Sequence, residues 1–273
     1  MNLKRILTSL IGFPLVVTFI ALGNAPVIDF AIMVVAIICM YEYIGVIKKV
    51  CNPIKWIMYL STAIVFFISI IPNDIMKYIM LSSIPVTLLI LFLHIIISDM
   101  KITFKDIAYT LLGIAYITGF IVFMSLIIIQ EKGKLAIGYI LMTAWATDVF
   151  AYTAGMLIGK HHFSKVSPKK TIEGCIAGII GALIVGFIYM IIASKVGAIS
   201  LDGIGYLCAV LVPIGLSIIS QIGDFAASSI KRFADAKDYG SLLPGHGGML
   251  DRIDSVIFIA PFVYMIMLIV QNF

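Results

Sequence analysis

A cluster of charged residues between Asp224 and Asp254 has a composition suited to handling phosphate groups. Five acidic and four basic residues fall in this segment of a largely apolar chain. If a helix continues into it, four residues at helical spacing share one face: Asp224, Ser228, Lys231 and Asp235. A face that mixes acids and bases suits a metal–phosphate assembly. It would equally suit an ion-paired helix in a solvated loop, and the pattern alone leaves both interpretations open.

The same segment ends in PGHGGMLDRID, residues 244–254. Glycines let a backbone approach a ligand closely with its N–H groups exposed. The apolar run after Met249 should begin a new helix, and a glycine turn that enters a helix N-terminus favours anion binding. Asp251 and Asp254 are three residues apart and therefore share a face of that helix. Because Mg²⁺ prefers oxygen ligands shared with phosphate, these aspartates are candidate ligands.

Two further stretches carry polar residues of the same kind. The segment GKHHFSKVSPKKTIEG, residues 159–174, combines lysines with hydroxyl groups, a pairing that suits phosphate oxygens. These residues are Lys160, Lys165, Lys169, Lys170, Ser167 and Thr171. A basic loop that only faces the cytoplasm would look similar. Asp148 lies well inside an apolar run, where a carboxylate is costly and usually faces a polar cavity.

The elements that must position these residues are membrane helices. Hydrophobic residues make up 62% of the 273 residues and charged residues only 12%, which excludes a soluble domain. A span needs about 20 apolar residues, and each should be a helix because unpaired backbone groups are costly in lipid. We therefore predict an all-α polytopic membrane protein with about nine spans. They cover roughly 6–22, 28–47, 54–71, 75–97, 106–129, 135–159, 175–193, 203–223 and 255–271.

The distribution of positive charge predicts the orientation. With the N-terminus in the cytoplasm, 15 of the 19 Lys and Arg residues fall on cytoplasmic segments, as the positive-inside rule requires. The C-terminus then lies outside, and the long loops 160–174 and 224–254 face the cytoplasm. The net charge of +5 reports this topology and does not indicate nucleic-acid binding. Glu42 and His94 fall near span ends and are expected at the membrane interface.

The chain is expected to divide into two regions. Residues 1–134 would form an N-terminal group of about five spans. Residues 135–273 would form a C-terminal catalytic region of about four spans, because this half holds both polar loops and Asp148.

Taken together, these motifs resemble the phosphatidate cytidylyltransferase family, also called CDP-diacylglycerol synthases. Its C-terminal signature has a serine, a Lys-Arg pair, Lys-Asp, a proline before His-Gly-Gly, then Asp-Arg and a final Asp. The matching residues are Ser228, Lys231, Arg232, Lys237, Asp238, Pro244, His246, Gly247, Gly248, Asp251, Arg252 and Asp254. The run from Ser167 to Gly174, and Asp148 with Ala151-Tyr152, also resemble this family. The motifs cover roughly residues 143–256.

The resemblance implies a reaction in phospholipid synthesis at the cell membrane, in which CTP and phosphatidate give CDP-diacylglycerol and pyrophosphate. It also suggests a homodimer. Asp224 and Asp251 are the expected Mg²⁺ ligands, and the expected catalytic residues are these two with Lys231, Arg232 and Arg252. The expected substrate-binding residues are Asp148, Ser167, Lys169, Lys170, Thr171, Glu173, Ser228, His246, Gly247, Gly248 and Asp254.

Two other functions fit parts of the sequence. A secondary transporter could use Asp148 as its coupling residue, but it predicts inverted repeats, and the polar residues here gather in the C-terminal half. A CTP-dependent polyprenol kinase would be a membrane enzyme that uses the same nucleotide on another lipid.

Overall fold

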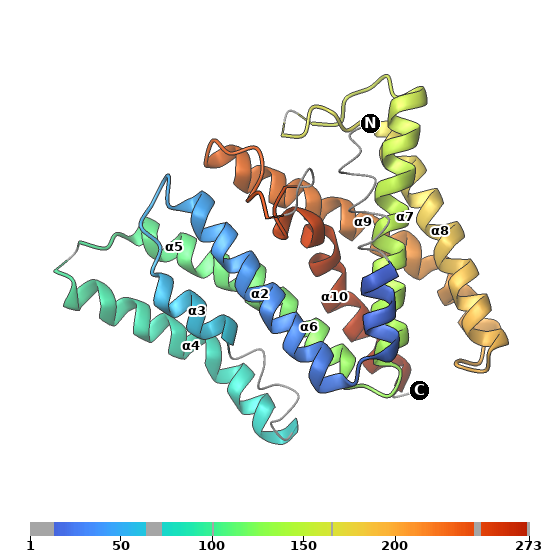
Figure 1. Cartoon of the computed structure of the whole chain (residues 1–273), viewed down its shortest axis with the longest axis horizontal. Helices are drawn as coiled ribbons and strands as arrows, with labels where there is room; N and C mark the ends of the chain where they lie inside the picture. The colour runs from blue at the N-terminus through green and yellow to red at the C-terminus, as the bar shows by residue number, and fades with distance from the viewer. Residues whose placement is uncertain (1–13, 64–72, 100, 165, 243–246, 272–273) are drawn as a thin grey trace. The chain divides into compact units, whose positions relative to one another are not determined.

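The structure, a computed structural model, is built from helices and describes residues 14–63, 73–99, 101–164, 166–242 and 247–271 (Figure 1). One isolated β-bridge pairs His162 with Thr171. A first helical stretch covers residues 14–22. The later helices are α2 (Ala25–Ile47), α3 (Lys55–Ala63), α4 (Asn73–Ile97), α5 (Phe104–Gly113), the π-helix η2 (Ile114–Thr118), α6 (Gly119–Ile128), α7 (Gly133–Ile158), α8 (Ile172–Lys195), α9 (Gly203–Phe233) and α10 (Leu250–Gln271).

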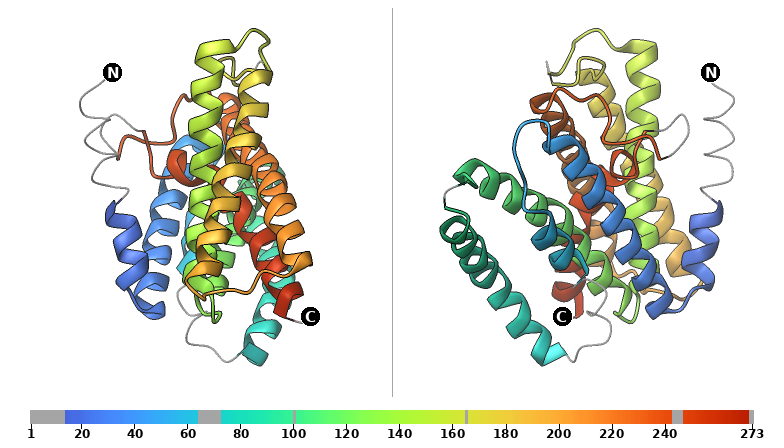
Figure 2. Two further views of the ribbon diagram at one scale, coloured as in Figure 1. Left: turned by 90° about the vertical axis from the view of Figure 1, so that its right-hand side faces the viewer. Right: turned by 60° about the vertical axis from the view of Figure 1, so that its left-hand side comes forward.

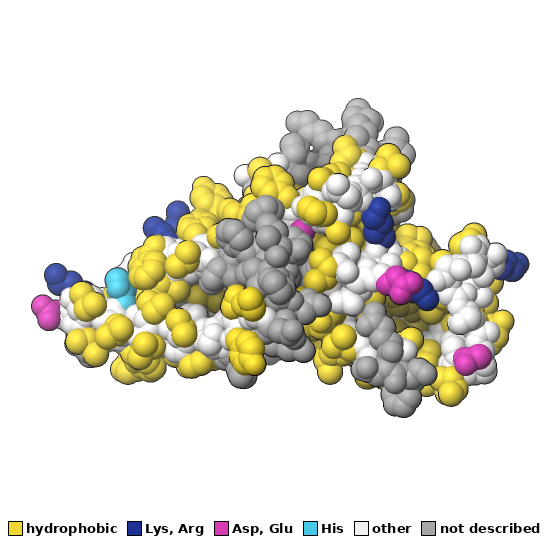
Figure 3. Space-filling model, turned by 90° about the horizontal axis from the view of Figure 1, so that it is seen from below, with side chains coloured by type: hydrophobic (Ala, Val, Ile, Leu, Met, Phe, Trp, Pro, Cys, Tyr) yellow, Lys and Arg dark blue, Asp and Glu magenta, His cyan; other side chains and the backbone are white. Residues whose placement is uncertain are grey.

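The all-α membrane architecture is confirmed. Among the described residues, six helical segments are long and apolar enough to cross a membrane: α2, the run from α5 to α6, α7, α8, α9 and α10. Hydrophobic side chains are abundant and charged ones sparse on the face drawn in Figure 3. The other three predicted spans coincide with the 14–22 helix, α3 and α4. The total of nine spans stays a prediction, since parts of the first and third predicted spans lie outside the described residues.

The helix boundaries differ from the prediction at the polar loops. Helix α9 continues to Phe233, ten residues past the predicted end at 223, so the loop begins at residue 234 and not at 224. The added turns bury Ala227, Ser228 and Lys231, so tertiary packing supports helix where polarity alone indicated loop. Helix α8 begins at Ile172, capped by Thr171, whose hydroxyl accepts the Gly174 N–H at 3.1 Å.

The chain folds into two compact units, and each of them combines two separate segments of the sequence. Unit 1 contains residues 1–131 and 234–252, and unit 2 contains residues 132–233 and 253–273. In unit 1, helix α2 packs against α3, α5 and α6. Part of its apolar core consists of Ile54, Ile57, Leu91, Ile95 and Ile107. The glycine-rich loop thus belongs to unit 1, although it follows the helices of unit 2 in sequence.

Unit 2 is centred on the pair α7 and α8, which lie side by side (Figures 1 and 2), with α9 packed against both. Small residues on α8 allow this close approach, because a Cβ at Gly178 would lie only 2.9 Å from the Thr147 carbonyl oxygen. Thr147 on α7 also donates a hydrogen bond of 2.9 Å to the Ser217 hydroxyl on α9. These contacts hold α7, α8 and α9 together, and so they position the α7–α8 loop and the end of α9 in the same unit.

Candidate active site

The predicted site residues fall into two groups, one in each unit. Unit 2 holds Asp148, the α7–α8 loop, the polar end of α9, and Asp254 on α10. Unit 1 holds Gly247, Gly248, Asp251 and Arg252. His246 lies outside the described residues, so its role stays a prediction.

The polar face expected on α9 exists within unit 2. Asp224, Ser228 and Lys231 lie on the same helix at intervals of four and three residues. Ser228 and Lys231 are 7% and 8% exposed, so this face is turned inward, whereas Arg232 next to it is exposed. Asp235 does not join the face, because α9 ends at Phe233 and Asp235 adopts a φ of 48°.

The α7–α8 loop folds back on itself as a small hairpin. The Phe163 N–H donates to the Lys170 carbonyl oxygen and the Ile172 N–H donates to the His161 carbonyl oxygen, both at 2.9 Å. This pairing explains how a loop rich in lysine keeps a defined shape. Of the predicted residues on it, Lys169 is exposed and Ser167 is half-buried.

Lys170 joins this hairpin to the polar face of α9. Its ammonium group forms an ion pair with the Asp224 carboxylate. The same ammonium lies 4.4 Å from the centroid of the Phe225 ring, a cation–π contact, and Phe225 in turn stacks on Phe163 at 4.8 Å. The structure therefore brings together Lys170 and Asp224, two predicted site residues that are 54 positions apart in the sequence.

Glu173 organises the other end of the hairpin. Its carboxylate accepts hydrogen bonds from the backbone N–H groups of Lys160 and His161 at 3.2 and 3.3 Å. It also contacts the His161 ring nitrogen Nδ1 at 2.6 Å. Glu173 and Thr171, the cap of α8, thus support the fold of the loop, and their predicted contacts with substrate stay predictions.

A buried carboxylate completes the group in unit 2. Asp254 is 5% exposed, and its Oδ1 atom accepts the Ser255 N–H at 2.7 Å. It interacts electrostatically with Asp224, Lys231 and Asp148. Asp148 itself is exposed in the middle of α7, so its carboxylate is accessible although the surrounding run is apolar. Three aspartates (Asp148, Asp224 and Asp254) and two lysines (Lys170 and Lys231) therefore lie near one another in unit 2. Such a group of charges can hold phosphate groups together with cations.

In unit 1, Asp251 closes the glycine-rich loop. Its Oδ2 atom accepts hydrogen bonds from the N–H groups of Tyr239 and Gly248, at 2.8 and 2.9 Å. Gly247 has a φ of +83°, a left-handed conformation that other residues adopt only with strain. Asp251 therefore shapes the turn in addition to any role toward a ligand.

Glu42, on α2, is a residue that the sequence analysis missed. Its predicted position at the membrane interface stays a prediction, and within the protein its side chain is buried, at 5% exposure. Its two carboxylate oxygens accept the N–H groups of Met249 and Leu250, at 2.9 and 2.8 Å, and so cap the start of α10. A Cβ at Gly248 would lie 2.5 Å from Glu42 Oε2, so a larger residue at this position would have to displace the carboxylate. An acidic residue inside the apolar stretch MYEY was the available signal.

The expected anion site at this helix N-terminus thus has a specific occupant. The N–H groups of Gly248, Met249 and Leu250 point to carboxylates of the protein itself, those of Asp251 and Glu42. A helix N-terminus attracts an anion, and here the anions are these two carboxylates. Any substrate phosphate at this turn would have to use other groups, such as the side chain of Arg252.

The predicted Mg²⁺ ligands, Asp224 and Asp251, lie one in each unit. Within the described residues, no group of three or more His, Cys, Asp or Glu side chains is close enough to form a metal site. A protein-only cage therefore does not fit. Mg²⁺ usually takes one or two carboxylates and completes its coordination with substrate phosphates and water. The assignment of Asp224 and Asp251 as Mg²⁺ ligands stays a prediction.

These features define a class, a helical membrane protein whose lysines and aspartates form a site suited to phosphate groups. The chain belongs to the Cytidylyltransferase family, whose family model matches residues 3–270. It is 33% identical over 264 residues to a phosphatidate cytidylyltransferase of Staphylococcus haemolyticus, a match that covers 94% of this chain and 95% of the relative. It is 34% identical over 175 residues to the phosphatidate cytidylyltransferase of Thermotoga maritima, covering 64% of each chain.

Proposed function

We propose that this protein transfers CMP from CTP to phosphatidate and releases pyrophosphate, giving CDP-diacylglycerol for phospholipid synthesis. Relatives named phosphatidate cytidylyltransferase align over nearly the whole chain, which supports this function. The structural observation that carries the proposal is the ion pair between Lys170 and Asp224, which lies on the same helix as the buried Lys231. It connects the motif of the α7–α8 loop with the motif of α9, which supports a phosphate-binding role for both.

The reaction needs charge neutralisation more than proton transfer. A phosphate oxygen of phosphatidate attacks the α-phosphorus of CTP and forms a new P–O bond. The bond from that phosphorus to the bridging oxygen breaks, and its electrons leave with pyrophosphate. Both reactants are anions, so positioned cations lower the barrier by offsetting their repulsion. A phosphate monoester is already largely ionised at neutral pH, so the chemistry requires no strong general base.

Different residues of this chain bind the phosphates, orient the lysines and support the site. Lys169, Lys170, Lys231, Arg232 and Arg252 bind phosphate oxygens of the two substrates. Asp224 orients Lys170 through their ion pair. We include Mg²⁺ in the proposal, held by Asp224 and Asp251 together with substrate phosphates; when bound, it would neutralise phosphate charge. Asp148 and Asp254 support the site from α7 and α10.

We further propose that the site faces the cytoplasm from the cell membrane, where CTP is available, and that the protein works as a homodimer. The excess of positive charge on the segments assigned to the cytoplasm supports this orientation. The N-terminus would then be cytoplasmic and the C-terminus outside.

A transfer assay with labelled CTP tests the function. Purified protein is given phosphatidate in detergent and CTP labelled at the α-phosphate. We expect the label to appear in the lipid, and pyrophosphate to form in equal amount. Label that stays in CDP would instead identify a CTP-dependent kinase. No conversion of CTP with phosphatidate would refute the proposal, and uptake of a solute into vesicles would then point to a transporter.

A further inference from the structure

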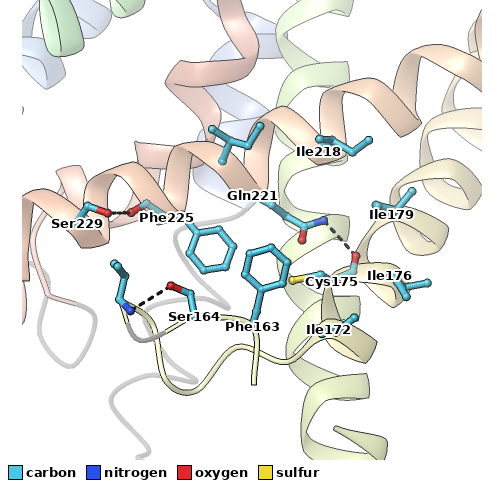
Figure 4. Close-up of a pocket in the computed structure, with 12 residues that line it drawn as sticks. Phe163, Ser164, Ile172, Cys175, Ile176, Ile179, Ile218, Gln221, Phe225 and Ser229 are labelled. Carbon is cyan, nitrogen blue, oxygen red and sulfur yellow. Dashed lines mark hydrogen bonds between the residues drawn. The ribbon is translucent and has the colours of Figure 1, made fainter. Parts of the chain in front are cut away.

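An apolar groove lies in unit 2 between α8, α9 and the α7–α8 hairpin (Figure 4). Its volume is about 540 Å³, within the range of about 300–1,000 Å³ that small-molecule sites occupy. Ile172, Ile176 and Ile179 line it from α8, at the spacing of one helix face. Ile218 and Ile222 line it from α9, and most of these side chains are exposed in the groove.

The Phe225 ring links the groove to the ammonium group of Lys170. Phe225 and Phe163 line the groove and stack on each other, and the Phe225 ring also contacts the Lys170 ammonium group. The same aromatic ring therefore borders the apolar groove on one side and the phosphate-binding lysine on the other. A ligand that fits both parts has an anionic head and an apolar tail.

The position of the groove favours a lipid over a soluble ligand. Helices α8 and α9 are both long and apolar enough to cross a membrane, so a groove between them can open to the bilayer. The Gln221 side chain on α9 donates a hydrogen bond of 3.1 Å to the Cys175 carbonyl oxygen on α8, and both residues line the groove (Figure 4). This bond keeps the two helices in register without placing a charge in the groove.

We propose that this groove binds an acyl chain of phosphatidate and thereby directs the phosphate of the lipid to Lys170. The proposal rests on the proposed function and adds the place where the lipid tail is held. Lys170 at the Phe225 ring favours this occupant over a neutral lipid, since its ammonium group can bind the phosphate monoester in addition to the Asp224 carboxylate.

A variant that fills the groove tests this assignment. Ile176→Trp places a larger side chain against the opposite wall, and Ile184→Trp is the matched control, because Ile184 is exposed on the same helix but does not line the groove. We expect Ile176→Trp to raise the KM for long-chain phosphatidate by about tenfold, which corresponds to about 1.4 kcal/mol. The KM for CTP and the rate with a short-chain phosphatidate should stay unchanged, as should all constants of Ile184→Trp.

The possible outcomes separate this proposal from its alternatives. Equal loss with long-chain and short-chain substrate would overturn it, and so would an unchanged KM for the long chain. If Ile176→Trp instead converted a dimer to monomers, the groove would be a contact between copies of the chain. Failure of the proposed function can be told apart from failure of the groove assignment. In the first case the unmodified protein would transfer no CMP to either the long-chain or the short-chain substrate.

A binding measurement supplies an independent test. Cys175 lines the groove, whereas Cys39 and Cys51 are buried, so a Cys208→Ala variant leaves Cys175 as the main accessible thiol. We expect phosphatidate in phosphatidylcholine vesicles to slow alkylation of Cys175 by a maleimide at least about fivefold relative to phosphatidylcholine alone, as expected when a ligand at several times its Kd shields the thiol. Equal labelling rates in the two kinds of vesicle would overturn the assignment to phosphatidate.

Discussion

The cap that Glu42 provides for α10 can be tested by removing its charge without changing its size. In Glu42→Gln the side-chain carbonyl can accept only one of the N–H groups of Met249 and Leu250, which the carboxylate now accepts at 2.9 and 2.8 Å. The amide NH₂ group then faces the other N–H, donor against donor. Leu250 is fully buried, so water cannot replace the lost partner.

The size of the effect follows from these two bonds. A hydrogen bond to a charged group contributes about 1.5–3 kcal/mol and a neutral one about 0.5–1.5 kcal/mol. Losing one charged bond and weakening the other costs the turn at Gly248–Leu250 about 2–4 kcal/mol of stability. At about 1.4 kcal/mol for each factor of ten, the equilibrium constant for forming this turn falls by about 30- to 700-fold. Because Asp251 depends on that turn for its position, we expect kcat/KM for CMP transfer to fall at least about tenfold.

The assay compares kcat/KM of three variants with labelled CTP, together with their thermal unfolding in detergent. Glu42→Asp keeps the charge and can still reach one N–H group, so it should retain more activity than Glu42→Gln. Glu131→Gln removes the same charge from an exposed position and should behave as the unmodified protein. If Glu42→Gln were as active as the unmodified protein, or more active than Glu42→Asp, the capping argument would be refuted, because shape and not charge would then matter.

Three other predictions concern the site and its surroundings. Asp224→Asn should lower kcat/KM by about 100-fold or more, as for other losses of a group that stabilises the transition state, whereas the exposed Asp235→Asn should have little effect; equal effects would contradict the assigned role. Chelation of divalent ions should stop CMP transfer and added Mg²⁺ should restore it, and full activity in excess chelator would exclude the proposed metal. Burial raises the pKa of Cys51 to about 11, with a smaller contribution from the Asp106 carboxylate. At pH 8 its thiolate fraction is then about 100-fold below that of an ordinary cysteine, so alkylation should be slow and should speed up toward pH 11; fast labelling at pH 8 in the folded protein would contradict this.

Several features could be predicted from local sequence because short-range rules govern them. Long apolar runs require membrane helices, since backbone groups in lipid must pair within the segment. The spacing of Asp224, Ser228 and Lys231 predicted a common helix face, and α9 provides it. Residue types in the C-terminal motif indicated the family to which the chain belongs.

Other features depended on which segments meet in space. The end of α9 was placed ten residues early, because the burial of Lys231 and Ser228 that supports those turns comes from tertiary packing. The ion pair between Lys170 and Asp224 joins two segments that no local pattern connects.

The sequence by itself determined the class of the protein, a multi-pass helical membrane protein, and the residue types of its phosphate site. Only the tertiary structure decided that Glu42 caps α10 from 207 residues away and that Asp251 holds the glycine-rich turn. The physical reason is that hydropathy and helical period act over a few residues, whereas the partner of a buried N–H group is set by how distant helices pack. The sequence indicated that the turn could attract an anion, and the fold supplied that anion from α2.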